Sequence, residues 1–505
     1  MTILNGNVSQ DLKELKNKYD AIVVGSGAGG GLVSEKLSLS GLSVLLIEMG
    51  PYKTAKDFNL NEGEAYLSLY QDGTNRYTKD KGIKVLQGRC VGGGTTVNWT
   101  SSFRTPDLVL SHWKDHYGWS QKMIADYKNK FSYIESKFNI SQWQMPPNEN
   151  NHILKKGLDK LNITNDVIPR NVKDCHNLGY CGMGCPKDAK QSTLVTCIPH
   201  FLKNKGTLLH SAEVQKFVEG KSDMTVTLSN GLNIKSDHLF ICSGGVGSPT
   251  LLKRSSLKDD KQLVGKRTFL HPVIASSAIF EDEVLPFYGA PQSVYSDHFI
   301  EKSKGCGFKL EVPPVHPVLL SSIVPFHGKE HRNALKSISN LNAIISLFRD
   351  GFHKESVGGS VSLNEYQKPE VDYQISEYMW DSFRESLKVM CEIQFEAGAK
   401  EVAPLHAHTK MCRNLKECLA LIDSLKMEIV SMPVMSAHVM GGCLMGDDKN
   451  RSVVDLNGKL RNSERVYICD GSLFPTSLGV NPMESILTLS DLIVNNFLKG
   501  ISYDT

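Results

Sequence analysis

The sequence predicts an α/β protein with two parts: a nucleotide-binding domain assembled from separated segments, and an α+β domain with an antiparallel sheet. Signals for βαβ units occur near both ends of the chain, and β-rich, irregular sequence lies between them. The 505 residues exceed the size at which one hydrophobic core stops growing, so two or more domains are expected. Lys and Arg number 57 against 54 Asp and Glu, and this near balance argues against a nucleic-acid partner.

The amino-terminal segment carries no recognisable targeting signal. It lacks the basic start and apolar run of a signal peptide. No uninterrupted apolar stretch reaches the roughly 18 residues that span a bilayer. We therefore expect a cytoplasmic protein without an integral membrane segment, whose twelve cysteines are mainly reduced thiols.

The first βαβ unit begins with the apolar run 20–24, which leads into the glycine cluster Gly25-Ser-Gly-Ala-Gly-Gly. The next residues predict an amphipathic helix, and a second strand over 43–47 ends at Glu48. Gly25 allows the tight turn, Gly27 lets a pyrophosphate approach the backbone, and Gly30 lets helix and strand pack closely. Glu48, about 20 residues further on, is placed to accept hydrogen bonds from ribose hydroxyls. FAD and NAD both use this unit, so the pattern alone does not separate them.

A second glycine-rich run, Gly-Arg-Cys-Val-Gly-Gly-Gly-Thr-Thr-Val-Asn-Trp, covers residues 88–99, and its successive glycines are expected to let backbone N–H groups form an anion-binding nest. It resembles the segment that wraps the pyrophosphate and flavin in glucose-methanol-choline (GMC) oxidoreductases, which are FAD enzymes. The resemblance assigns Gly93, Thr95 and Asn98 to FAD binding. Members with covalently bound FAD carry histidine at the position of Val97, so non-covalent FAD is expected here.

The resemblance extends over nearly the whole chain. Residues 241–252 resemble the family's second signature, and residues 209–214 resemble the strand whose backbone, here at Val214, meets adenine. Asp470 takes a position near the flavin's ribityl-pyrophosphate. Residues 350–351 and 395–402 resemble parts of the family's substrate domain. The implied architecture is a Rossmann-like FAD-binding domain built from 17–105, 195–271 and 436–505, a cap region at 106–194, and a substrate-binding domain at 272–435.

His438 and Asn481 are the candidate catalytic pair. His438 lies in His-Val-Met-Gly-Gly-Cys, where the resemblance places the family's active-site histidine. Its imidazole, with an unperturbed pKa of about 6.5, is suited to accept the proton of an alcohol. Asn481 is expected to donate a hydrogen bond to the substrate oxygen as negative charge develops. Cholesterol oxidases and long-chain alcohol oxidases resemble this chain in having Asn-Pro here, and Pro482 is assigned to the cofactor site.

Cys175, Cys181 and Cys185 form the one cysteine cluster of the sequence, with five and then three residues between them. A comparable spacing holds an iron-sulfur cluster in GMC-type sugar dehydrogenases of bacterial membranes. The residues after Cys185 instead resemble a segment of long-chain alcohol oxidases. A structural loop without metal is therefore favoured over an electron relay.

The expected function is FAD-dependent oxidation of a CH–OH group, with proton removal at His438 and hydride transfer to flavin N5. The substrate is expected to be a hydrophobic alcohol, and the electron acceptor is oxygen, a quinone or a protein. Three alternatives stay open: a dehydrogenase that relays electrons through an iron-sulfur cluster, a lyase or decarboxylase on the same flavin fold, and a non-catalytic flavoprotein. An NAD-dependent enzyme would leave the segments around Gly88 and Asp470 unexplained.

Overall fold

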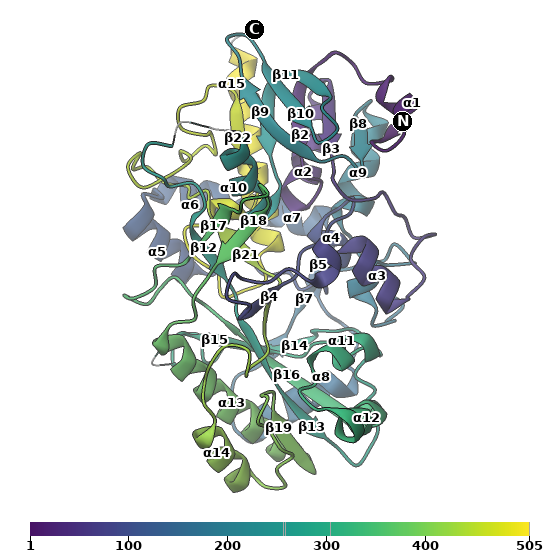
Figure 1. The fold of residues 1–505 in the computed structure, drawn as a ribbon, viewed down its shortest axis with the longest axis vertical. Helices are drawn as coiled ribbons and strands as arrows, with labels where there is room; N and C mark the ends of the chain where they lie inside the picture. Colours follow the sequence, from purple (N-terminus) through teal and green to yellow (C-terminus); the bar gives the residue numbers. More distant parts are fainter. Residues whose placement is uncertain (256, 258, 304, 504–505) are drawn as a thin grey trace.

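The computed structural model describes residues 1–255, 257, 259–303 and 305–503. Two lobes are stacked along the long axis of the molecule, and the first strand, β1 (Thr2–Asn5), and the last helix, α15 (Met483–Tyr503), both lie in the upper lobe (Figure 1). Each lobe has its own large sheet and hydrophobic core. Within the described residues, no helix is both long and apolar enough to cross a membrane.

A mostly parallel sheet forms the centre of the upper lobe. Its strand order is β1-β8-β3-β2-β11-β10-β9, and β22 pairs in parallel with the end of β11. The neighbours from β1 to β11 are parallel, whereas β10 pairs antiparallel with β11 and β9. The strands are β1 (Thr2–Asn5), β2 (Lys18–Val24), β3 (Val44–Ile47), β8 (Thr207–His210), β9 (Val214–Glu219), β10 (Met224–Leu228), β11 (Asn233–Ile241) and β22 (Val466–Ile468).

Segments far apart in the sequence thus meet in one sheet, which confirms the predicted Rossmann-like domain assembled from separated segments. The sheet also includes β1, which precedes the predicted start at residue 17.

Helix α2 (Ala28–Leu39) follows the glycine turn and lies between α9 (Thr193–Lys203) and α15 (Met483–Tyr503). The prediction that it is amphipathic is wrong. Nine of its twelve residues are buried, because helices cover it on the sides that the sheet leaves open. A Cβ on Gly30 would lie 1.8 Å from the Gly25 carbonyl oxygen, so close helix–strand packing requires glycine there, as the motif predicts.

The lower lobe centres on a sheet with the order β4-β20-β13-β16-β15-β14-β6, and β19 pairs with part of β13. All neighbouring pairs are antiparallel except β4 and β20. The strands are β4 (Ile83–Val85), β6 (Asp166–Val167), β13 (Val273–Ile279), β14 (Val294–Ser296), β15 (Phe308–Glu311), β16 (Leu341–Phe348), β19 (Glu401–Pro404) and β20 (Val434–Ser436).

The two faces of this sheet have different neighbours, as β16 shows. Alternate residues Ala343, Ile345 and Leu347 line a cavity beneath the sheet. Asn342 points to the opposite face, where its Oδ1 accepts a hydrogen bond from Gln394 Nε2 on α13 (Glu377–Ala397) at 2.9 Å. Helices α8 (Glu149–Lys160) and α14 (Leu415–Ser424) pack against α13 (Figure 1). The part of the underside that these residues form is therefore apolar.

A smaller antiparallel sheet, β18-β17-β12-β21, lies between the lobes (Figure 1). Its strands are β12 (Lys266–Leu270), β17 (Gly359–Leu363), β18 (Pro369–Asp372) and β21 (Val439–Gly441), and a two-stranded sheet joins β5 (Ile140–Gln142) to β7 (Pro169–Asn171). The remaining helices are α1 (Ser9–Leu12), α3 (Glu62–Leu69), α4 (Gly94–Val97), α5 (Asp107–Tyr117), α6 (Gln121–Lys128), α7 (Phe131–Lys137), α10 (Gly244–Arg254), α11 (Pro317–Ile323) and α12 (Gly328–Lys336).

The predicted cap region, 106–194, packs against both lobes. Helices α6 and α7 pack against α15 in the upper lobe. Helix α8 packs on α13, and β6 pairs with β14 in the lower lobe. This region therefore ties the two lobes together.

Candidate active site

A cavity of about 980 Å³ lies where the two lobes meet. Its wall includes the glycine turn after β2, the 88–99 segment, the start of α10 and the underside of the antiparallel sheet. It brings together most of the site residues predicted from the sequence, namely Gly25, Gly27, Glu48, Gly93, Thr95, Asn98, Val214, His438, Asp470, Asn481 and Pro482. Gly30 lies outside the wall and serves the packing of α2 on the strand turn.

The glycine-rich segments form a narrow cradle at one end of the cavity. Gly93 has a φ of +52°, and a Cβ on it would lie 2.8 Å from the Cα of Gly27. Two glycines from segments some 66 residues apart thus bring their backbones into direct contact, and neither carries a side chain that would cover the cavity wall there. This arrangement fits the pyrophosphate of a dinucleotide, because backbone N–H groups are left accessible to its oxygens.

Glu48 is buried at the end of β3 and is held by the glycine turn. Its Oε2 accepts hydrogen bonds from Ser26 N at 3.0 Å and Ser26 Oγ at 2.7 Å, and its Oε1 accepts one from Gly50 N at 2.8 Å. Burial raises the pKa of Glu48, while these hydrogen bonds stabilise the charged form. Sequence reasoning missed Ser26, although it lies inside the glycine motif. Its hydroxyl also accepts from Gly92 N at 2.9 Å and so joins the two glycine segments.

Asp470 links two walls of the cavity. Its Oδ2 accepts from Gly244 N at 2.9 Å, at the start of α10, and from the Ser248 hydroxyl. Its Oδ1 accepts from Ser472 N at 2.8 Å. Burial raises the pKa of Asp470. Thr95 also has a structural hydrogen bond, from its Oγ1 to the Gly92 carbonyl at 2.7 Å.

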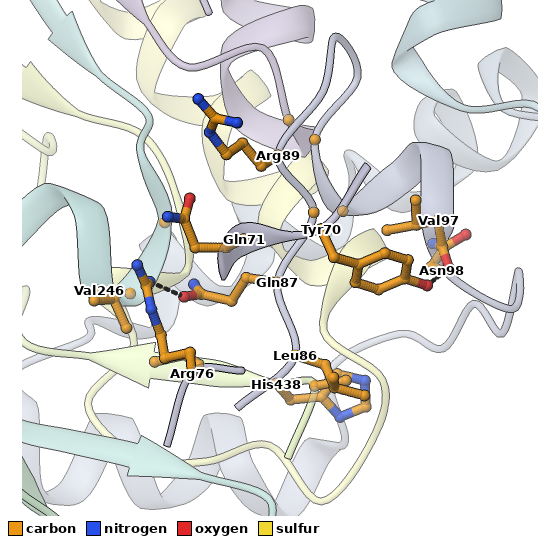
Figure 2. A pocket seen from close by; sticks show the side chains of 18 of the residues that line it. Tyr70, Gln71, Arg76, Leu86, Gln87, Arg89, Val97, Asn98, Val246 and His438 are labelled. Carbon is orange, nitrogen blue, oxygen red and sulfur yellow. Dashed lines mark hydrogen bonds between the residues drawn. The ribbon is translucent and has the colours of Figure 1, made fainter. Parts of the chain in front are cut away.

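Arg76 and Gln87 also line the cavity and were missed by sequence reasoning. Arg76 Nη1 donates to Gln87 Oε1 at 2.6 Å (Figure 2). Arg76 Nε also lies 3.1 Å from Asp72 Oδ2, so an ion pair within the wall balances the charge of the guanidinium. Arg76 belongs to no motif, so no sequence signal pointed to it.

His438 lies just before β21, beside Leu86 in Figure 2, and the cavity is on its exposed side. Its Nδ1 is 3.0 Å from Nδ1 of His271, which is fully buried at the end of β12. His271 Nε2 accepts a hydrogen bond from Gly479 N at 2.9 Å. Burial, with a smaller contribution from Lys309, lowers the pKa of His438 to about 4, so its imidazole is neutral near pH 7.

Asn481 lines the cavity near a buried polar cluster that the sequence did not single out. The carboxylate of Glu311 accepts a hydrogen bond from Gln292 Nε2 at 2.6 Å through Oε2, whereas Glu311 Oε1 and Asn481 Oδ1 have no hydrogen-bond partner among the described residues. Lys309 Nζ lies 3.5 Å from Glu311 Oε1 and 3.1 Å from the ring centroid of Phe103. Burial raises the pKa of Glu311 and lowers that of Lys309 to about 8.

A sequence signal for this cluster existed. Lys309 and Glu311 are charged residues at alternate positions of the strand-like run 307–312, so they share one face of a strand that is otherwise apolar. Two charges on the buried face of a predicted strand indicate a paired, functional or structural site.

Cys175, Cys181 and Cys185 are partly exposed free thiols around a small pocket that also contacts Arg170. In the described part of the chain, no set of three or more His, Cys, Asp or Glu residues is arranged to hold a metal ion. The loop lies behind the 88–99 segment, because Lys190 Nζ donates to Asn98 O at 2.9 Å and to Cys181 O at 2.6 Å. It therefore supports the cavity wall.

Comparison with protein families decides the family of this chain. Two family models, both described as GMC oxidoreductase, match residues 66–273 and 355–490, which together make up more than half of the chain. The chain belongs to the GMC oxidoreductase family. This confirms the resemblance found in the sequence, and with it the prediction of a flavin-dependent oxidoreductase.

Curated relatives of this GMC protein include plant enzymes. Long-chain-alcohol oxidase FAO4A of Arabidopsis thaliana is 28% identical over 504 aligned residues, covering 94% of this chain and 68% of the relative. FAO1 of the same plant is 26% identical, covering 99% and 70%. Among solved structures, pyridoxine 4-oxidase from Mesorbium loti has a TM-score of 0.70 at 16% identity, covering 95% of this chain and 99% of the other. The structural match supports the fold alone.

Proposed function

We propose that this GMC protein is an FAD-dependent oxidase of hydrophobic, long-chain alcohols. The observation that carries the proposal is the composition of one cavity. A polar pair, His438 and Asn481, lies on its wall near an apolar roof formed by alternate residues of two neighbouring strands, Val273, Ala275, Ala343, Ile345 and Leu347. Such a cavity holds an alkyl chain against the roof while the two polar side chains bind the hydroxyl group. The names of the plant relatives agree with this substrate class.

The residues fit FAD as the cofactor. The cradle of Gly27 and Gly93 would hold the pyrophosphate, Glu48 would meet the adenosine ribose, and Asp470 would lie near the ribityl chain. When bound, the flavin supplies hydride acceptance at N5. Val97 is a buried residue without a nucleophilic atom, which supports non-covalent FAD.

The protein's own groups would hold the alcohol. The low pKa of His438 supplies a neutral imidazole at physiological pH. The role of His438 as acceptor of the hydroxyl proton stays a prediction, as do the electron acceptor, the cytoplasmic location and a metal-free cysteine loop.

The test uses purified, FAD-loaded protein under anaerobic conditions with a series of primary alcohols of increasing chain length, with sterols as a second panel. We expect long-chain alcohols to bleach the flavin and oxygen to restore its colour with release of hydrogen peroxide. Reoxidation by quinone but not by oxygen would make the protein a dehydrogenase. If no alcohol bleaches the flavin, the proposal is wrong.

A further inference from the structure

We propose that the loop 175–185 is a site of modification by hydrogen peroxide, at which Cys181 is oxidised and Cys175 then closes a disulfide that weakens FAD binding. The three thiols of this loop do not belong to the wall of the large cavity, and the proposed alcohol oxidation does not use them. The inference does not depend on that function, because its test uses added peroxide. An oxidase that passes electrons to oxygen would also supply this oxidant.

The thiols of the loop are accessible and lie around one small pocket. Cys175, Cys181 and Cys185 are partly exposed, whereas the other nine cysteines of the chain are buried. The pocket has a volume of about 30 Å³, which admits a small oxidant rather than a bulky one. Cys175 Sγ accepts a hydrogen bond from Asn177 N at 3.4 Å, so its sulfur is held within the loop. These three thiols are therefore the cysteines that a dissolved oxidant reaches first.

Two buried cations beside the pocket, Arg170 and Lys190, form no ion pair with a carboxylate among the described residues. Burial lowers the pKa of both, that of Lys190 to about 8, and the acidic groups that oppose this are thiols, with Cys181 first in each case. Arg170 Nη2 lies 3.8 Å from Cys181 Sγ, and Arg170 Nε is a buried donor without a partner. Buried cations without an anion are costly, so negative charge on the Cys181 sulfur is stabilised here.

A thiolate is the form of cysteine that attacks peroxide. The Cys181 sulfur attacks one peroxide oxygen, the O–O bond breaks and hydroxide leaves, so the sulfur is oxidised to a sulfenic acid and the peroxide is reduced. The Cys175 thiol then attacks that sulfur, its proton leaves with the hydroxyl group as water, and a disulfide forms. Burial raises the pKa of Cys175, which keeps this thiol protonated until the second step. Cys175 is the expected partner because it is the other thiol that acts on Arg170.

Lys190 connects the oxidised residue to the 88–99 segment of the cavity wall. Its Nζ donates to Thr96 O at 2.5 Å, to Asn98 O at 2.9 Å and to Cys181 O at 2.6 Å. A charged donor stabilises such bonds more than a neutral one does. Oxidation removes the negative charge that favours the ammonium and draws the Cys181 sulfur toward its partner thiol. Both effects weaken the bonds that hold the segment in place.

Tyr70 and Arg170 make a second connection to the same wall. The Tyr70 hydroxyl donates to Gly182 O at 2.7 Å, and Arg170 Nη2 lies 3.4 Å from Trp99 O. A Cβ on Gly182 would lie 3.1 Å from Trp99 Nε1, so the loop packs directly on this ring. Tyr70 and Trp99 both line the large cavity. A shift of the loop on disulfide closure is thus transmitted to the wall that would hold FAD.

The first test treats purified, FAD-loaded protein with hydrogen peroxide, blocks the remaining thiols with iodoacetamide and maps the peptides by mass spectrometry. We expect a disulfide between Cys175 and Cys181 that dithiothreitol reverses. Cys185→Ser, which removes the third thiol of the pocket, is the matched control and should form the same disulfide. Cys175→Ser should stop at a Cys181 sulfenic acid that dimedone captures. Alkylation of all three thiols after peroxide treatment, a disulfide that uses Cys185, or stoichiometric iron in the untreated protein would overturn the proposal.

Retention of FAD tests the connection to the cavity. Free FAD is separated by ultrafiltration and quantified by its fluorescence before and after peroxide treatment. Loss of one hydrogen bond from a charged donor should raise the dissociation constant of FAD about ten-fold or more, and dithiothreitol should reverse the change. Cys181→Ser should show no change on peroxide treatment. A disulfide that leaves the dissociation constant of the wild type unaltered would refute control of the cofactor by this loop. Neither measurement needs an alcohol, so a failure of the proposed function leaves both results interpretable.

Discussion

The neutral His438 ring makes a specific prediction for the pH dependence of stability. Its pKa is about 4 in the folded protein against 6.5 for a free imidazole. Because the folded value is lower, the unfolded chain binds the proton first as the pH falls. Stability is therefore full above pH 6.5 and is lost progressively down to about pH 4. Between pH 7.5 and pH 5.5 this group should reduce the free energy of unfolding by about 1.3 kcal/mol.

The variant His438→Gln removes the titrating group while keeping a polar side chain beside His271. We expect the difference in unfolding free energy between wild type and variant to move by about 1.3 kcal/mol in favour of the variant from pH 7.5 to pH 5.5. Urea titrations with saturating FAD at the two pH values measure this difference, and His408→Gln serves as a matched exposed control. A change below about 0.3 kcal/mol would refute the idea that burial holds the ring neutral.

Other variants test the packing of the site and its chemistry. Lys309→Met should lower the free energy of unfolding by about 3–5 kcal/mol, because it leaves Glu311 buried without its cation. The double variant Lys309→Met, Glu311→Leu should recover most of this loss, and urea titrations of both variants measure the difference. Ala343→Phe, on the apolar roof, should reduce kcat/KM for long-chain alcohols about ten-fold or more and affect short-chain alcohols less, as an alcohol series would show. Gly30→Ala should abolish FAD retention, since its Cβ would overlap the Gly25 carbonyl; normal flavin absorbance after gel filtration would contradict this. Because the FAD is expected to be non-covalent, acid precipitation should release all of it into the supernatant. Metal analysis should find no stoichiometric iron, because the loop of Cys175, Cys181 and Cys185 is expected to hold no metal.

Local motifs account for the part of the fold that could be predicted from the sequence. The run from residue 20 to Glu48 has a strand, a glycine turn and a helix in immediate succession, and the structure has β2, α2 and β3 in that order. Residues 307–312 and 359–363 also have strand-like sequence, and residues 379–397 have helix-like sequence; the structure has β15, β17 and α13 there. The predicted amphipathic character of α2 failed because α9 and α15, which cover it, come from distant parts of the chain.

The sequence by itself determined the family, the glycine-rich turns and two polar side chains, His438 and Asn481, that line the cavity. These features depend on residue type at fixed spacing, so they are visible without a structure. Only the tertiary structure decided which groups surround that pair. The neighbours of His438 and Asn481 come from elsewhere in the chain: His271 is 167 residues from His438, and the buried Lys309 and Glu311 lie on a strand of the other lobe. No local pattern encodes such contacts, because they form only when the two sheets close over one cavity.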